Sequence, residues 1–164
     1  MSTPFIDEVY ERVDFERDLV FKFFTVFSLF EYALKRAEFA RATGNNNDVK
    51  PDWDRFAHDI EQDFNPQASP ELANAVNYLL SFPVKRQVLR NDSLSFVPRR
   101  RPPNLRDTEW LSLIIRGIRN NLFHGGKFRY HPERDNELLQ SSLIILEAWS
   151  ECNDLVKEEL RIIK

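Results

Sequence analysis

Cysteine, glycine and long hydrophobic runs are scarce in this 164-residue sequence, and each shortage excludes a class of protein. The single cysteine, Cys152, cannot form an intrachain disulfide bond, and with three histidines it cannot form a structural zinc site without carboxylates. Four glycines, nine prolines and 42% hydrophobic residues exclude collagen-like, low-complexity and wholly disordered chains. The longest apolar run, Phe23–Phe30, is interrupted by Thr25 and Ser28, so it is too short and too polar to span a membrane.

The remaining composition predicts a single soluble domain. The N-terminal residues carry acids where a secretory signal would carry bases, and together with the lone cysteine this predicts a cytoplasmic protein that does not enter a membrane. At about 150 residues per domain, the length predicts one domain over residues 1–164. We expect no metal ion and no cofactor, because the sequence has neither a nucleotide-binding glycine loop nor a convincing set of metal ligands.

The net charge of −3 hides an uneven distribution along the chain. Residues 84–134 contain twelve bases and four acids, a net charge of +8, which leaves −11 for the rest of the sequence. A basic segment in an acidic chain attracts a polyanion such as RNA locally. A solvated basic loop would have the same composition.

The spacing of apolar residues is that of helices, and no segment alternates with a period of two over a useful length. We therefore expect an all-α bundle of four or five helices. The first helix has apolar residues on more than one side, which predicts burial at the centre of the bundle or between subunits. The expected helices span about 14–42, 51–65, 69–82, 104–125 (capped by Asn104 or Asp107) and 132–160.

Residues 83–104 join two of these helices and are expected to form a long basic loop. Pro98, Pro102 and Pro103 exclude a regular helix and a central strand here. Three consecutive arginines, Arg99, Arg100 and Arg101, adjoin Phe96 in the sequence, a combination that guides single-stranded RNA by charge and stacking. A disordered tether is the alternative.

One polar sector of the 104–125 helix contains the candidate site. At 100° per residue, Arg116, Arg119, Asn120 and His124 all face away from the apolar stripe. Phe123 falls in the same sector, where an isolated bundle would expose its ring to water. A second copy of the chain is the simplest cover, so we expect a homodimer with Phe123 in its interface.

Arginine and histidine together can cleave RNA without a metal ion. The 2′-hydroxyl needs a base, the leaving 5′-oxygen needs an acid, and the charge that develops on the phosphate needs fixed donors. Arg119 and His124 are about 140° apart on an ideal helix, so they do not share a face. They would meet at one phosphate if the helix loosens at 124–126, or if a partner subunit contributes its own pair.

The segment from Arg119 to His124, with Asn120 after the arginine and Gly125-Gly126-Lys127 after the histidine, resembles the signature of the HEPN family. Residues 30–35, Phe-Glu-Tyr-Ala-Leu-Lys, also resemble the first helix of stand-alone members. The resemblance covers about two-thirds of the chain. It implies a dimeric, metal-independent endoribonuclease of toxin, antiviral or RNA-processing type, with Arg119 and His124 as the catalytic pair and Asn120 orienting the histidine or the phosphate. Some members of the family are inactive binding modules.

Simpler explanations exist for several of these residues. Positive charge is favoured near a helix C-terminus, and for Arg116 we favour this over a contact with RNA. His124 would also suit a helix end before a glycine. Lys127, Arg129 and His131 alternate along the chain and are candidate phosphate contacts or an ordinary loop.

Glu31 is an acid among apolar neighbours in the first helix, and a buried carboxylate needs a partner. Two partners are considered equally: Lys35, one turn along the same helix, and Arg119, which the carboxylate would hold in position across the bundle.

The leading hypothesis is a HEPN-type endoribonuclease that cleaves single-stranded RNA as a homodimer, with an antitoxin or other regulatory protein as a further expected partner. The alternatives are a catalytically silent HEPN module that binds RNA or a protein, and a plain helical scaffold dimer.

Overall fold

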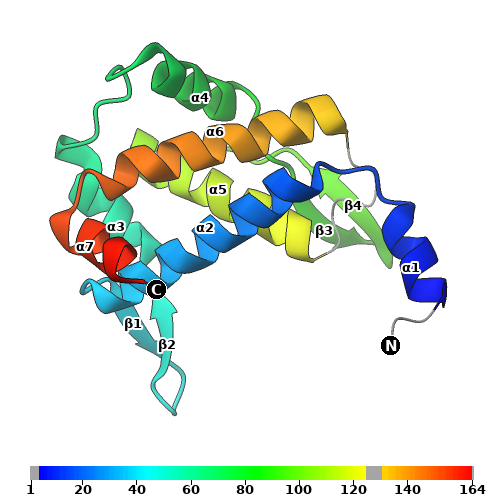
Figure 1. Ribbon diagram of the computed structural model, residues 1–164, viewed down its shortest axis with the longest axis horizontal. Helices are drawn as coiled ribbons and strands as arrows, with labels where there is room; N and C mark the ends of the chain where they lie inside the picture. The colour runs from blue at the N-terminus through cyan, green and yellow to red at the C-terminus, as the bar shows by residue number, and fades with distance from the viewer. Residues whose placement is uncertain (1–3, 125–130, 164) are drawn as a thin grey trace.

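The computed structural model describes residues 4–124 and 131–163, and this part of the chain is mostly helical (Figure 1). It contains seven α-helices, one 3₁₀ helix and two β-hairpins, so the expectation of an all-α bundle was wrong in its detail. In chain order the elements are α1 (Pro4–Glu11), α2 (Arg17–Arg36), β1 (Ala40–Thr43), β2 (Asp48–Pro51), α3 (Trp53–Asp59), η1 (Ile60–Gln62), α4 (Pro70–Ser81), β3 (Arg86–Arg90), β4 (Ser93–Val97), α5 (Asp107–Phe123), α6 (Pro132–Ser150) and α7 (Asp154–Ile162).

Helix α6 is the centre of the packing. It contacts α2 and α5 and is covered on another side by α4, while α7 packs on α2 and α3 packs on α5 (Figure 1). The β1–β2 hairpin projects from one side, and the β3–β4 hairpin lies beside α5 at the end of the molecule where α1 is found (Figure 1). No helix among the described residues combines the length and the apolar character that crossing a membrane requires.

Aromatic side chains from three helices, α2, α3 and α6, form much of the core. The Trp53 indole stacks on the rings of Phe27 and Phe30, with centroids 5.4 and 5.5 Å apart. Phe56 meets Phe30 and Trp149 edge to face, at 5.5 and 6.2 Å. All five side chains are at most 3% exposed. Such pairs contribute about 0.5–1.5 kcal/mol each beyond the burial of their area, so this cluster fixes the position of α3 against α2.

Helix α2 is shorter than the predicted helix over 14–42, because the backbone leaves the helical conformation at Glu38. The φ angle there is 68°, in the left-handed region, and the N–H of Phe39 donates to the Leu34 carbonyl at 3.0 Å. Phe39 is thereby buried, and strand β1 follows. The helix also keeps an exposed apolar face that includes Phe21 and Phe24, 69% and 40% exposed, so it is not buried all round.

The predicted C-terminal helix over 132–160 is two helices, because the chain turns at residues 151–153. Asn153 begins α7 as its N-cap, and its Oδ1 accepts from the N–H of Val156 at 3.0 Å. Its Nδ2 donates to Asp59 Oδ2 at 3.1 Å, which ties the turn to α3.

The basic segment 83–104 contains a hairpin rather than a continuous loop. Strands β3 and β4 pair in antiparallel register from Arg86 opposite Val97 to Arg90 opposite Ser93. Asn91 and Asp92 form the two-residue turn, with φ angles of 48° and 58°. Two central residues with positive φ give the turn type that matches the twist of a hairpin.

Helix α5 begins at Asp107, and neither Asn104 nor Asp107 is its N-cap. Arg106 holds that position, and its N–H donates to the Glu109 carboxylate at 2.9 Å. The predicted cap of α4 is confirmed, because Ser69 Oγ accepts from the N–H of Leu72 at 3.1 Å.

Candidate functional site

The predicted catalytic residues lie at the C-terminal end of α5, and solvent reaches all of them. Asn120 and His124 are exposed and Arg119 is half-buried. Arg119 Nη1 donates to Asn120 Oδ1 at 3.1 Å, so the asparagine next to the arginine helps to hold the guanidinium in position.

Two aromatic rings flank the Arg119 guanidinium. Its central carbon lies 5.9 Å from the ring centroid of Phe27 and 5.3 Å from that of Phe123. Among the described residues, Arg119 forms no ion pair with a carboxylate. Its charge is therefore available to an anion from solution, while the rings restrict where the guanidinium moves.

His124 is the C-cap of α5, and the helix does not loosen before it. Its N–H donates to the Asn120 carbonyl at 2.9 Å, which is the normal bond of an α-helical turn. Arg119 and His124 thus keep the angular separation of about 140° that an ideal helix gives. Gly125, Gly126, Lys127 and Arg129, which were predicted to loosen the helix end or to contact RNA, lie outside the described residues.

The ring of Phe123 is 47% exposed, as its place in the polar sector predicted. It contacts the ring of Phe24 from α2, with centroids 4.9 Å apart, and Phe24 is itself 40% exposed. One chain therefore covers Phe123 only in part, and the paired rings of Phe24 and Phe123 form an exposed aromatic surface, with Phe123 beside Arg119.

Asn121 has a structural role that the sequence reasoning missed. It is 6% exposed, and its Nδ2 donates to the Lys85 carbonyl at 2.8 Å, which joins α5 to the base of the β3–β4 hairpin. The helical wheel contained the signal, because a residue 100° beyond Asn120 falls on the edge of the apolar stripe.

Neither predicted partner of Glu31 was correct. Glu31 Oε1 accepts a hydrogen bond from the indole Nε1 of the buried Trp53 at 2.9 Å. Within the described part of the chain, no ion pair joins Glu31 to Lys35 or to Arg119. Glu31 therefore satisfies a core tryptophan and does not touch the predicted catalytic arginine.

The other arginines that were predicted to contact RNA lie in different parts of the structure. Arg116 pairs with Asp54 of α3 at 2.9 Å, a contact that neither interpretation of this residue predicted. Arg101 pairs with Asp107 at 2.6 Å and its Nε donates to the Leu105 carbonyl, so it is tied to the start of α5.

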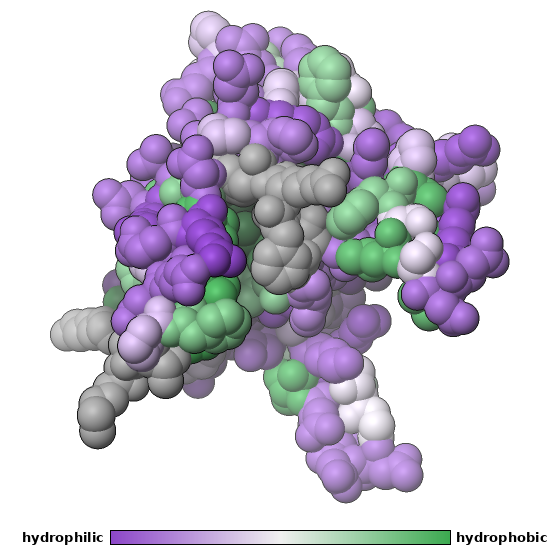
Figure 2. Space-filling view, turned by 90° about the vertical axis from the view of Figure 1, so that its right-hand side faces the viewer, coloured by the Kyte–Doolittle hydropathy of each residue, from purple (hydrophilic) through white to green (hydrophobic). Residues whose placement is uncertain are grey.

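Arg99 and Arg100 line a cavity of about 660 Å³ together with Arg86 and Arg90, two hairpin residues that the sequence reasoning did not single out. The β3–β4 hairpin projects at the right of the view in Figure 2, where it carries both hydrophobic and hydrophilic side chains. The Asn91-Asp92 turn, followed by the short alternation Ser93-Leu94-Ser95-Phe96, was the signal that could have predicted a hairpin with Arg86 and Arg90 on its first strand.

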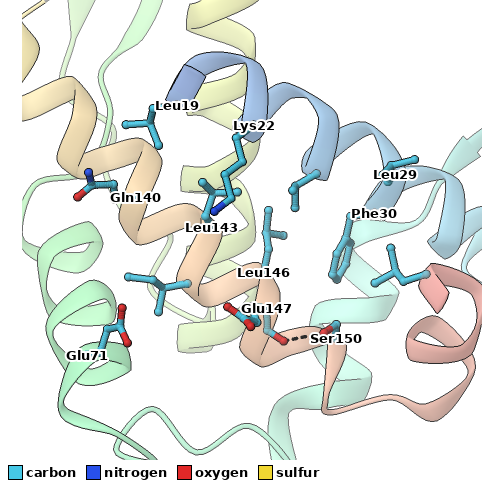
Figure 3. Close-up of a pocket in the computed structure, with 13 residues that line it drawn as sticks. Leu19, Lys22, Leu29, Phe30, Glu71, Gln140, Leu143, Leu146, Glu147 and Ser150 are labelled. Atoms are coloured by element: carbon cyan, nitrogen blue, oxygen red, sulfur yellow. Dashed lines mark hydrogen bonds between the residues drawn. The ribbon is translucent and has the colours of Figure 1, made fainter. Parts of the chain in front are cut away.

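A second concavity of about 680 Å³ lies between α2 and α6, away from all of these residues (Figure 3). Its walls are mainly aliphatic and include Leu19, Leu29 and Leu143, and Lys22 and Glu147 supply charges (Figure 3). None of the predicted site residues lines it.

Among the described residues, no group of three or more histidine, cysteine, aspartate or glutamate side chains is placed to hold a metal ion. No family model matches the chain, and no curated protein or solved structure matches it either.

Proposed function

We propose that this protein cleaves single-stranded RNA without a metal ion, at a site that two copies of the chain build together. The observation that carries the proposal is the state of Arg119: solvent-accessible, oriented by Asn120 and two aromatic rings, and without an ion-pair partner among the described residues. A guanidinium in that state suits a phosphate whose charge increases during cleavage. His124, exposed five residues on, supplies the proton transfer that the 2′-hydroxyl or the leaving 5′-oxygen requires.

Two copies are needed because one helix cannot bring the pair together. The His124 N–H still forms the last helical hydrogen bond of α5, so the two side chains leave the helix about 140° apart. A two-fold axis near this helix end would place the arginine of one copy beside the histidine of the other. The exposed rings of Phe24 and Phe123 pack on each other, Phe123 lies beside Arg119, and the two rings are the apolar surface that such an interface would bury. The resemblance of residues 119–127 to the HEPN signature supports the same arrangement.

The first test is cleavage of a single-stranded RNA in the presence of a chelator. We expect cleavage to persist and to leave a 2′,3′-cyclic phosphate, because the adjacent 2′-hydroxyl attacks instead of a metal-activated water. His124→Ala should reduce the rate by about 100-fold or more, and Arg119→Ala by a comparable factor. His58→Ala is the matched control, because His58 is an equally exposed histidine on α3 and should retain full activity. Full activity of either site variant, or loss of wild-type activity with chelator, would contradict the mechanism.

Mixing the two inactive variants tests whether the site is shared. A heterodimer of Arg119→Ala and His124→Ala chains has one site with both residues intact only if each site takes its arginine and histidine from different copies. Random exchange of subunits should then restore about a quarter of the wild-type rate. No restoration, with exchange shown by mass spectrometry, would place both residues of each site in one chain.

The separation of Arg119 and His124 also favours a second candidate function, a catalytically silent module that binds RNA through Arg119 or binds a regulatory protein such as an antitoxin. RNA binding by a folded dimer, with no cleavage and with an affinity that Arg119→Ala reduces and His124→Ala does not, would select this alternative.

A further inference from the structure

The cavity beside the β3–β4 hairpin is lined by four arginines, and it is a different place from the end of α5. Arg86 and Arg90 come from β3, and Arg99 and Arg100 from the segment that follows β4. The remaining walls are largely apolar and comprise Phe96, Val97, Pro98, Pro102, Trp110 and Leu113. A volume of about 660 Å³ is that of a site for a small ligand or for part of a larger one.

The four guanidinium groups have no compensating acid within the described part of the chain. None of them forms an ion pair there, whereas neighbouring Arg101, Arg106 and Arg116 each pair with a carboxylate. Arginines beside the cavity are therefore paired with carboxylates, whereas the four that line it are not. Like charges grouped at an apolar wall repel one another, and a bound anion relieves this repulsion.

Arg99 occupies the least solvated position of the four. Its Nε is buried without a hydrogen-bond partner among the described residues, and its Nη2 would lie 2.9 Å from a Cβ built on Gly117 of α5. Burial lowers the pKa of the Arg99 guanidinium, and the charges of Arg86 and Arg116 lower it further. The missing side chain at Gly117 thus lets a partly desolvated, unpaired guanidinium lie directly against the helix.

We propose that this arginine pocket (Arg86, Arg90, Arg99 and Arg100) binds a phosphate group carried by a nucleotide or by an RNA strand. Guanidinium groups match phosphate oxygens in a bidentate geometry, and the apolar walls strengthen that interaction by excluding water. The Phe96 ring, 41% exposed, offers a stacking surface for the base next to the phosphate. The pocket is complete within one chain, so the proposal does not depend on cleavage at Arg119 and His124.

Binding is tested by titrating the dimer or monomer, as purified, with inorganic phosphate, AMP and a ten-nucleotide oligouridylate in a calorimeter at low salt. Arg99→Gln should weaken binding of the tightest probe by about 10-fold or more, the value of a lost charge-assisted contact. Arg99→Lys keeps the charge but loses the bidentate geometry of the guanidinium. Its affinity for the same probe should lie between those of the wild-type chain and Arg99→Gln. Arg101→Gln is the matched control, because Arg101 is two residues away but engaged by Asp107, and should change affinity by less than about twofold.

The three probes separate the sources of the phosphate. AMP that binds and displaces the oligonucleotide identifies a free nucleotide, whereas an oligonucleotide that AMP does not displace identifies the RNA backbone. Equal losses in Arg99→Gln and Arg101→Gln would show only diffuse attraction and overturn the pocket, as would the absence of heat with all three probes. Repeating the titration with His124→Ala keeps the RNA uncut, so failure of the cleavage proposal leaves this test intact.

Discussion

Replacing Glu31 by alanine tests the structural role assigned to this carboxylate. The variant leaves the Trp53 indole N–H without its acceptor, and Trp53 is 3% exposed between the rings of Phe27 and Phe30. An unsatisfied buried donor costs about 1–3 kcal/mol, and a hydrogen bond to a charged acceptor contributes about 1.5–3 kcal/mol. Glu31 is itself only half-buried, so water reaches part of the site and we expect a loss of about 1.5–2 kcal/mol in the free energy of unfolding.

The assay is urea unfolding followed by far-ultraviolet circular dichroism, which does not depend on the emission of Trp53 itself. The midpoint should fall with an unchanged m-value, and the melting temperature should fall by about 2–4 °C per kcal/mol. Glu31→Gln keeps an acceptor oxygen and should recover part of the loss. Lys35→Ala is the control for the rejected ion pair and should cost less than about 0.5 kcal/mol. Wild-type stability of Glu31→Ala, or an equal loss in Lys35→Ala, would refute the assignment.

Three further predictions concern separate contacts. Asn121→Ala should cost about 1–3 kcal/mol in urea unfolding, because it removes the buried bond to the Lys85 carbonyl; an unchanged midpoint would show that the hairpin is held otherwise. Ser69→Ala should cost about 1 kcal/mol through loss of the cap on Leu72, and Ser69→Asp should restore stability if capping is the cause. Burial raises the pKa of the Cys152 thiol, so as pH rises through the ordinary thiol range the unfolded state loses the thiol proton while the folded state keeps it. The free energy of unfolding therefore falls over that pH range. Iodoacetamide should accordingly react with Cys152 more slowly than with glutathione at pH 8, and an equal rate would contradict the burial.

The helical regions could be predicted because their signals are local. Ser69 followed by Pro70 marks the start of α4 by its own chemistry, and the apolar stripe of α5 appears at the expected spacing. The ends were predicted less well, because they depend on tertiary contacts. Phe39 is buried against Phe56, with ring centroids 5.3 Å apart, and this packing accompanies the left-handed backbone at Glu38 that ends α2.

The β3–β4 hairpin was missed because prolines in the flanking sequence dominated the interpretation. Pro83 and Pro98 both lie just outside the strands, where they break no hydrogen bond of the ladder. The Asn91-Asp92 turn was the opposing signal, since both residues tolerate positive φ better than most. A two-stranded hairpin is also weakly encoded on its own, and this one is held by a contact from Asn121, 36 residues from Lys85 in the sequence.

The candidate site shows the same division between local and distant information. The wheel of α5 predicted that Arg119, Asn120, Phe123 and His124 would be accessible, because direction on a helix follows from spacing alone. It could not predict that Trp53 is the partner of Glu31, since that contact depends on how α3 packs against α2.

The two proposed sites differ in how many chains they need, and this makes their functions separable. The arginine pocket takes all four guanidinium groups from one chain, whereas the proposed cleavage site combines Arg119 of one copy with His124 of another, because the two leave α5 in different directions. A charged residue in place of Phe123 should prevent two copies from meeting there. The Phe123 ring is exposed in one chain, and an aromatic ring at the centre of an interface contributes most to binding when the partner fully desolvates it. We therefore expect Phe123→Asp to be monomeric by light scattering, to lose cleavage, and to bind phosphate-bearing probes as tightly as the wild-type chain. Cleavage by a monomeric Phe123→Asp would show that one chain holds the whole catalytic site, and a parallel loss of phosphate binding would show that the pocket also depends on the dimer.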